Sequence, residues 1–168
     1  AAMPCMVMSA ADVGKSGYET ADELDADALF FKRVEKMRLE PGHRMGLGDV
    51  SGQVQPKIVI LSPPRTGGSI TSRYFVPDKT HETHAITGGI AVAYASVTSG
   101  TVAEPLTELQ TNGNKPRFSI EHPAGQLHLS LSLKDGKSGK ELEAAGITRT
   151  ARMIMRGSIM VPEHLMHR

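Results

Sequence analysis

Two histidines, His81 and His84, stand three residues apart and directly before Thr87-Gly88-Gly89. Imidazole exchanges protons near neutral pH, so such a pair suits acid–base catalysis. The free N–H groups in a helix's first turn attract anions, and glycine lets a ligand approach the backbone. A helix starting near Thr87 would therefore bind a carboxylate or phosphate. Alternatively, Thr87 is a simple N-cap, the glycines pack against a sheet, and one histidine is exposed while the other is bonded in the core.

The same histidines are weak candidates for a metal site. Two histidines would need a third protein ligand, which Asp78 or Glu82 could supply. The H-x-x-H spacing, however, lacks the i,i+4 pair and the glutamate of the zinc-protease helix motif. Cys5 is the sequence's one cysteine, so neither an internal disulfide nor a Cys-based zinc site can form. We expect no metal and no cofactor.

A second candidate is the loop Ser62-Pro63-Pro64-Arg65-Thr66-Gly67-Gly68-Ser69. Its diproline is rigid, and a guanidinium can hold a carboxylate through two parallel hydrogen bonds, so Arg65 could clamp a substrate. The alternative, which the spacing alone favours, is a hairpin connection in which Arg65 pairs with an acidic surface residue. A third interpretation, Ser62-Pro63-Pro64 as a docking or phosphorylation motif, predicts a disordered loop.

Short predicted elements surround these segments. A capping-box pattern, Thr20 with Glu23, begins a helix that Pro41-Gly42 should end. An apolar helix is expected from about 83 to 97, buried on every side. The first of these helices is expected to bury a stripe formed by Leu24, Ala28, Phe31, Val34 and Met37. The predicted strands are 4–8, 57–61, 70–76, 117–121, 126–133, 148–155 and 158–161.

The methionines at 153, 155 and 160 alternate on the last predicted strand pair, which favours a role as core filler. Six or seven strands, one amphipathic helix and one buried helix predict an α+β fold. In that fold a curved, mostly antiparallel sheet wraps around the buried helix.

The composition limits the classes of partner. The chain has 168 residues, 39% hydrophobic, and a formal net charge of +1, which predicts one globular domain. The scattered Lys and Arg residues argue against nucleic-acid binding. No apolar run is long enough for a membrane span and no signal peptide is visible, so we expect a soluble, cytoplasmic protein without a membrane partner.

Several segments together resemble the C-terminal half of the 2-methylaconitate cis-trans isomerase and 4-oxalomesaconate tautomerase family, whose fold is similar to that of diaminopimelate epimerase. The segments appear in family order over nearly the whole chain. They are RMGLGDV at 44–50, PK at 56–57, SPPRTGG at 62–68, SRYFVP at 72–77, HAITGG at 84–89, IEHPAG at 120–125 and TRTAR at 148–152.

The resemblance implies that residues 1–168 are the C-terminal domain of a two-domain enzyme whose N-terminal half is absent. It also implies a central helix near Thr87 that points its start into an interdomain cleft. The implied chemistry moves a proton in an unsaturated di- or tricarboxylate of the aconitate type, without a cofactor. A base removes an acidic C–H proton, and the delocalised carbanion is reprotonated elsewhere.

Where family members have His-Arg-Cys-His, this chain has Asp78-Lys79-Thr80-His81, so a thiol position is occupied by Thr80. A hydroxyl cannot replace a thiol as acid or base near neutral pH. His81 is therefore the expected catalytic residue of this half. The expected substrate-binding residues are Ser62, Arg65, Thr80, His84, Thr87, Gly88 and Gly89.

Two further expectations concern the chain as a whole. The abrupt start at Ala1 suggests that the chain is cut from a longer protein. Because a cleft site needs both walls, the isolated chain should be inactive. A homodimer is a further expected partner arrangement. The alternative is a non-catalytic module of the same fold that binds carboxylates or another partner.

Overall fold

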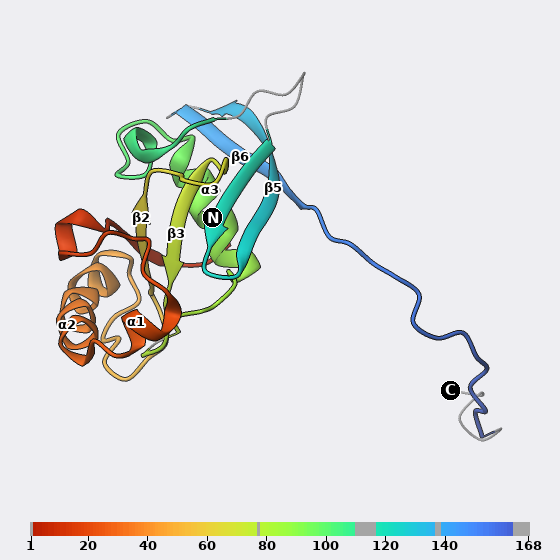
Figure 1. The fold of residues 1–168 in the computed structure, drawn as a ribbon. Helices are drawn as coiled ribbons and strands as arrows, with labels where there is room; N and C mark the ends of the chain where they lie inside the picture. The colour runs from red at the N-terminus through yellow and green to blue at the C-terminus, as the bar shows by residue number, and fades with distance from the viewer. Residues whose placement is uncertain (1, 77, 110–116, 137–138, 163–168) are drawn as a thin grey trace.

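The computed structural model describes residues 2–76, 78–109, 117–136 and 139–162. Its centre is a curled sheet of six strands that neighbour one another in chain order (Figure 1). β1–β2 and β3–β4 are parallel, and the other three neighbouring pairs are antiparallel, so the sheet is mixed. The strands are β1 Cys5–Ser9, β2 Lys57–Ser62, β3 Ile70–Tyr74, β4 Arg117–His122, β5 Gly125–Gly136 and β6 Gly139–Ile147.

The two parallel pairs determine where the helices lie, because parallel neighbours need a long crossover. The crossover from β1 to β2 contains α1 (Ala21–Asp25) and α2 (Ala28–Arg44). The crossover from β3 to β4 contains α3 (Ile86–Ser96). Figure 1 shows α1 and α2 on one side of the sheet and α3 on the other. Short 3-10 turns occupy Ala11–Val13 and Glu104–Leu106.

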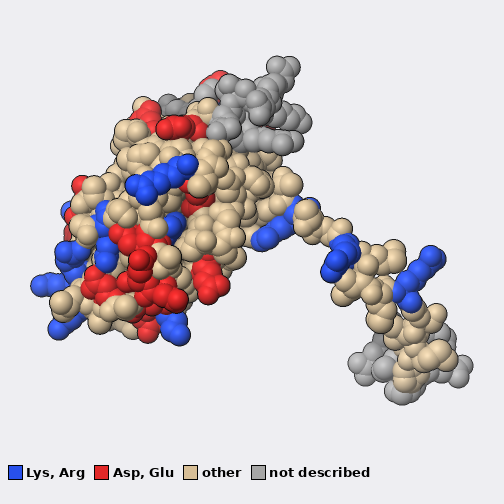
Figure 2. All heavy atoms as spheres, viewed as in Figure 1, with Lys and Arg blue, Asp and Glu red and all other residues tan. Residues whose placement is uncertain are grey.

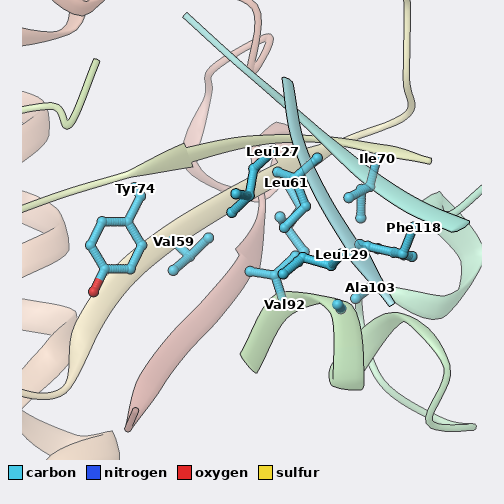
Figure 3. Packing of buried hydrophobic residues seen from close by; sticks show 11 residues of the cluster. Val59, Leu61, Ile70, Tyr74, Val92, Ala103, Phe118, Leu127 and Leu129 are labelled. Carbon is cyan, nitrogen blue, oxygen red and sulfur yellow. The ribbon is translucent and has the colours of Figure 1, made fainter. Parts of the chain in front are cut away.

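Alternate residues along the central strands fill two separate cores, as the period of two requires. The core between the sheet and α3 includes Val59 and Leu61 of β2, Tyr74 of β3 and Val92 of α3, with the side chains converging as Figure 3 shows. We call this side of the sheet the α3 face.

The opposite side, which we call the α2 face, buries Ile58 and Ile60 of β2 together with Phe30 and Phe75. The rings of Phe30, Phe31 and Phe75 contact one another with centroids 5.4 to 5.6 Å apart, a geometry that favours aromatic pairs. One sheet thus has a helical layer on each face.

The predicted capping box is confirmed: the Thr20 hydroxyl accepts from the Glu23 N–H, and the Glu23 carboxylate accepts from the Thr20 N–H. The single predicted helix is instead two helices, because the Asp27 carboxylate caps a second start by accepting from the Phe30 N–H. The prediction that Pro41 ends the helix is wrong, since α2 continues to Arg44.

The break between α1 and α2 changes which residues are buried. Leu24 and Val34 are buried as predicted, but Ala28 and Met37 are exposed, and Phe30 and Arg38 are buried in their place. Arg38 tolerates burial because its guanidinium pairs with Glu35 and donates to two backbone carbonyls. The new start at Asp27 shifts the helical phase, which the sequence periodicity did not reveal.

The predicted final strand pair, 148–155 with 158–161, is wrong. The last strand is β6, which pairs with β5, and residues 148–162 form an extended segment without secondary structure (Figure 1). Met153, Met155 and Met160 are exposed rather than core filler. Figure 2 shows this segment standing away from the body with cationic side chains along it.

Candidate functional site

The start of α3 is fixed by close packing of two glycines against the sheet. A Cβ on Gly88 would lie 2.2 Å from the Tyr74 ring, and one on Gly89 would lie 2.6 Å from the Leu127 side chain. The packing interpretation of these glycines is therefore confirmed. The N-cap is Ala85, whose side chain cannot cap, and Thr87 is an exposed residue of the first turn. Among the described residues no side chain caps the helix, and its first N–H groups have no intrahelical acceptor.

His84 holds the segment before α3 against β3. Its Nε2 lies 3.0 Å from the Ser72 hydroxyl and its Nδ1 lies 3.0 Å from the Ala85 carbonyl oxygen. These partners fit an imidazole that donates from Nδ1 and accepts at Nε2. Burial lowers the pKa of His84 to about 4; the Ala85 carbonyl opposes this shift, whereas His122 and His81 reinforce it. His84 is thus a neutral group with both ring nitrogens engaged by the protein.

His81 lies closer to the surface than His84. Its backbone N–H donates to the Tyr74 carbonyl at 2.7 Å, and its Nδ1 lies 3.2 Å from the Thr83 hydroxyl. The ring centroid is 6.1 Å from that of Tyr74, the same ring against which Gly88 packs. His81 and the start of α3 therefore both lie against the ring of Tyr74.

His122, at the end of β4, completes a group of three histidines. Its Nδ1 is buried and has no hydrogen-bond partner among the described residues. Burial lowers its pKa, the Glu82 backbone opposes the shift, and the charges of Arg73 and His81 add to it. Sequence reasoning missed His122, although it lies within the block IEHPAG.

Thr80 is buried just before His81. Its backbone N–H donates to an Asp25 carboxylate oxygen at 2.7 Å, which ties this segment to the end of α1. Its hydroxyl has no hydrogen-bond partner in the described part of the chain. A side chain this enclosed, 7% exposed, does not present its hydroxyl to a ligand from solvent.

The second candidate, the loop 62–69, is ordered around the buried carboxylate of Glu121. That carboxylate accepts from the backbone N–H groups of Arg65, Thr66 and Gly68 at 2.6 to 2.8 Å, and from the Thr71 hydroxyl at 2.8 Å. Burial alone would raise the pKa of Glu121, but these donors outweigh it and lower the pKa to about 2. Glu121 was not predicted as a functional residue. Its carboxylate occupies the backbone N–H groups of this loop that could otherwise bind an anion.

The side chains of this loop contact the segment that precedes α1. The Arg65 guanidinium lies 3.3 Å from the centre of the Tyr18 ring, a cation–π contact, and remains exposed. The Tyr18 hydroxyl donates to the Pro63 carbonyl, and the Ser62 hydroxyl donates to the Ser16 carbonyl. The disorder that a docking motif would require is not observed.

The two candidate groups lie on opposite faces of the sheet. Thr71 bonds to Glu121, whereas its neighbour Ser72 bonds to His84 on the α3 face. Adjacent strand residues point to opposite faces, so Glu121 and the Arg65 loop belong to the α2 face. The structure brings His81, His84, Thr87, Gly88 and Gly89 together, but it does not bring Ser62 and Arg65 to them.

A hollow of about 200 Å³ lies beside the histidine segment. It is lined by Thr20, Ala21, Asp22, Glu82, Pro123 and Ala124. In the described part of the chain, no group of three or more His, Cys, Asp or Glu residues could hold a metal ion. The described residues also contain no helix that is long and apolar enough to cross a membrane.

Known proteins whose sequences are similar to this chain are about twice as long as the chain. YbhH of Escherichia coli is 42% identical over 161 residues, covering 96% of this chain and 45% of YbhH. The 4-oxalomesaconate tautomerase of Pseudomonas putida is 36% identical over 159 residues, covering 95% of this chain and 43% of that enzyme. This chain therefore spans less than half the length of these relatives.

The fold has a counterpart among solved structures. The crystal structure of methylitaconate-delta-isomerase superimposes with a TM-score of 0.72 at 23% identity, covering 88% of this chain and 44% of that one. The sequence model of the PrpF protein family matches residues 1–162, nearly the whole chain. The chain therefore belongs to the PrpF protein family.

Proposed function

We propose that this chain is one half of a cofactor-independent isomerase that moves a proton in an unsaturated di- or tricarboxylate. The observation that carries the proposal is the uncapped start of α3 beside His81, in a chain of the PrpF protein family. Relatives at 36% and 40% identity are named 4-oxalomesaconate tautomerase and (4E)-oxalomesaconate Delta-isomerase, which supports the class of reaction.

The first turn of α3 binds a substrate carboxylate. The N–H groups of Thr87 and Gly88 lie in that turn, and in the described part of the chain no side-chain cap occupies the helix start. The positive end of the helix dipole favours the bound carboxylate and the negative charge that develops when a proton leaves. Gly88 and Gly89 serve this site indirectly, since they let α3 approach Tyr74 and Leu127.

His81 moves the proton. Its imidazole takes a proton from a carbon next to the conjugated system, and the electron pair of that C–H bond delocalises toward the substrate carboxylate. Return of a proton to a different carbon shifts the double bond, and atoms and charge balance without an oxidant or reductant. His84 and Thr80 position this segment through Ser72 and Asp25.

The active site lies in a cleft between this chain and a second half of similar size. Support comes from the relatives, of which the chain covers 43% to 45%. The exposed first turn of α3 would form one wall, and the isolated 168 residues would not turn over substrate. Ser62 and Arg65 lie on the other face of the sheet and are outside this site.

The test follows double-bond movement by proton NMR in deuterated water. The full-length polypeptide is incubated with oxalomesaconate, methylaconitate and aconitate in turn. We expect deuterium at an allylic carbon and a shifted double bond for at least one acid. Binding without exchange, with unchanged affinity in His81→Ala, would identify a non-catalytic carboxylate-binding module instead.

The role of His81 is tested with a matched histidine. His81→Asn should lower kcat about 100-fold or more, the usual contribution of a positioned acid or base, with little change in KM. His128→Asn is the control, because His128 is exposed on β5 and its Nδ1 bonds to Ser119. Equal activity in both variants would remove His81 from the mechanism.

A further inference from the structure

Residues 148–162, which we call the C-terminal arm, expose an unusual amount of apolar surface. Beyond Thr148, whose N–H still donates to the His128 carbonyl, the arm leaves the sheet (Figure 1). Met153, Met155 and Ile159 are 78%, 84% and 89% exposed. Large side chains gathered in this way normally mark a surface that another protein segment covers.

The order of residues in the arm is that of a β-strand with one face more apolar than the other. The odd positions from 153 to 161 are Met153, Met155, Gly157, Ile159 and Val161. The even positions from 152 to 160 are Arg152, Ile154, Arg156, Ser158 and Met160. A repeat of two places all odd side chains on one face, which favours a half-buried strand over an amphipathic helix. Pro162, which cannot donate to a ladder, follows directly and ends the strand.

The family match indicates that the arm is not an accessory tail. The PrpF family pattern extends to residue 162 and so includes the arm. Within the described structure the arm joins no strand, because the sheet ends at β6. More than half of YbhH lies outside the region that this chain matches, which provides a second body of protein for the arm to contact.

We propose that residues 152–161 add a β-strand to the half of the full-length enzyme that this chain does not span, with the odd face turned into that half's core. The proposal rests on the two-half organisation proposed above. Main-chain hydrogen bonds would give the arm its affinity, and the apolar face would fix its register. Arg152 and Arg156 on the even face are exposed and stay at the surface. Figure 2 shows cationic side chains along the arm.

Hydrogen–deuterium exchange on the full-length polypeptide tests the pairing. Amides paired in a strand should exchange at least about 100-fold more slowly than those of an unstructured chain. We expect this protection at alternate amides between 153 and 161. Exchange at the unstructured rate throughout the arm would overturn the proposal.

Two double variants distinguish the faces. Met155→Lys with Ile159→Lys places charges on the odd face and should abolish the protection. Ile154→Lys with Met160→Lys adds the same charges to the even face and should preserve it. Equal effects of the two pairs would contradict a strand with one buried face.

Two rival occupants give different results. Protection that disappears on dilution would identify a second copy of the chain, and binding of the arm to vesicles of anionic lipid would identify a membrane surface; either result overturns the proposal. The proton-exchange assay is read separately. A protected arm without isomerase activity removes the proposed function alone, and activity with an unprotected arm removes this inference alone.

Discussion

The Ser72 hydroxyl lies 3.0 Å from Nε2 of His84, inside the core between β3 and the start of α3. This contact is made by a histidine that burial holds neutral, with its pKa lowered to about 4 from the ordinary value of 6.5. The buried imidazole therefore links the stability of the site to pH.

The free energy of unfolding should fall as the pH is lowered from 7.5 to 5. The unfolded chain binds a proton at His84 below about 6.5, whereas the folded chain resists until about 4. The stabilisation is thus complete above the unfolded pKa and is lost as pH falls toward the folded one, by about 2 kcal/mol between pH 7.5 and 5. Urea titrations at both pH values measure it. His84→Gln, which cannot titrate, should show a clearly smaller fall.

Glu121→Gln should loosen the loop 62–69. The glutamine amide points N–H donors at backbone N–H donors that now bond to a carboxylate, so we expect a loss of about 1–3 kcal/mol. Amide exchange at Arg65, Thr66 and Gly68 should accelerate together, as NMR can measure. Glu82→Gln, on an exposed side chain, is the control and should change neither quantity.

Gly88→Ala should displace α3 from the sheet. The new Cβ would meet the Tyr74 ring at 2.2 Å, a distance that forces movement of a buried ring. We expect a loss of about 1–3 kcal/mol, typical of overpacking, seen as a lower thermal midpoint. Thr87→Ala, one residue earlier and exposed, should change stability by less than about 0.5 kcal/mol.

Asp25→Ala should release the segment that carries His81. The Asp25 carboxylate accepts from the Thr80 N–H, and its removal leaves a buried donor without its acceptor. A loss of about 1 kcal/mol and faster exchange of the Thr80 amide are expected. Asp25→Asn retains an accepting oxygen and should behave much like the parent; if both variants match the parent, this bond does not fix the segment.

Local sequence patterns located most of the sheet. Short apolar runs bounded by turn residues predicted β2 and β3, and the alternating leucines after the turn at Pro123-Ala124 predicted β5, each within a few residues of the observed strand. β6 was missed because GKELEAAGI is polar and lacks alternating β-branched residues. It is a strand because β5 offers it an antiparallel partner, and such tertiary pairing overrides propensity.

The candidate site was predicted only where it is local. His81, His84 and the glycines of α3 are near one another in sequence, and the structure keeps them near one another in space. Glu121 was missed because its role depends on the parallel register in which Thr71 faces it. His122 was missed because His81 and His84, the histidines near it, come from a distant part of the sequence. Arg65 was grouped with α3 because sequence spacing cannot show which face of a sheet a loop covers.

The two parallel strand pairs also bear on how the chain folds. Met6 of β1 pairs with Ile58 of β2, and Ile70 of β3 pairs with Ile120 of β4, so each pair closes a long loop that contains helices. Proteins dominated by such distant pairings fold slowly, because the entropy of loop closure is lost before the contacts compensate for it. The hairpin of β4 and β5 needs no such closure and can form early. We therefore expect the hairpin of β4 and β5 to form before the histidine site during folding.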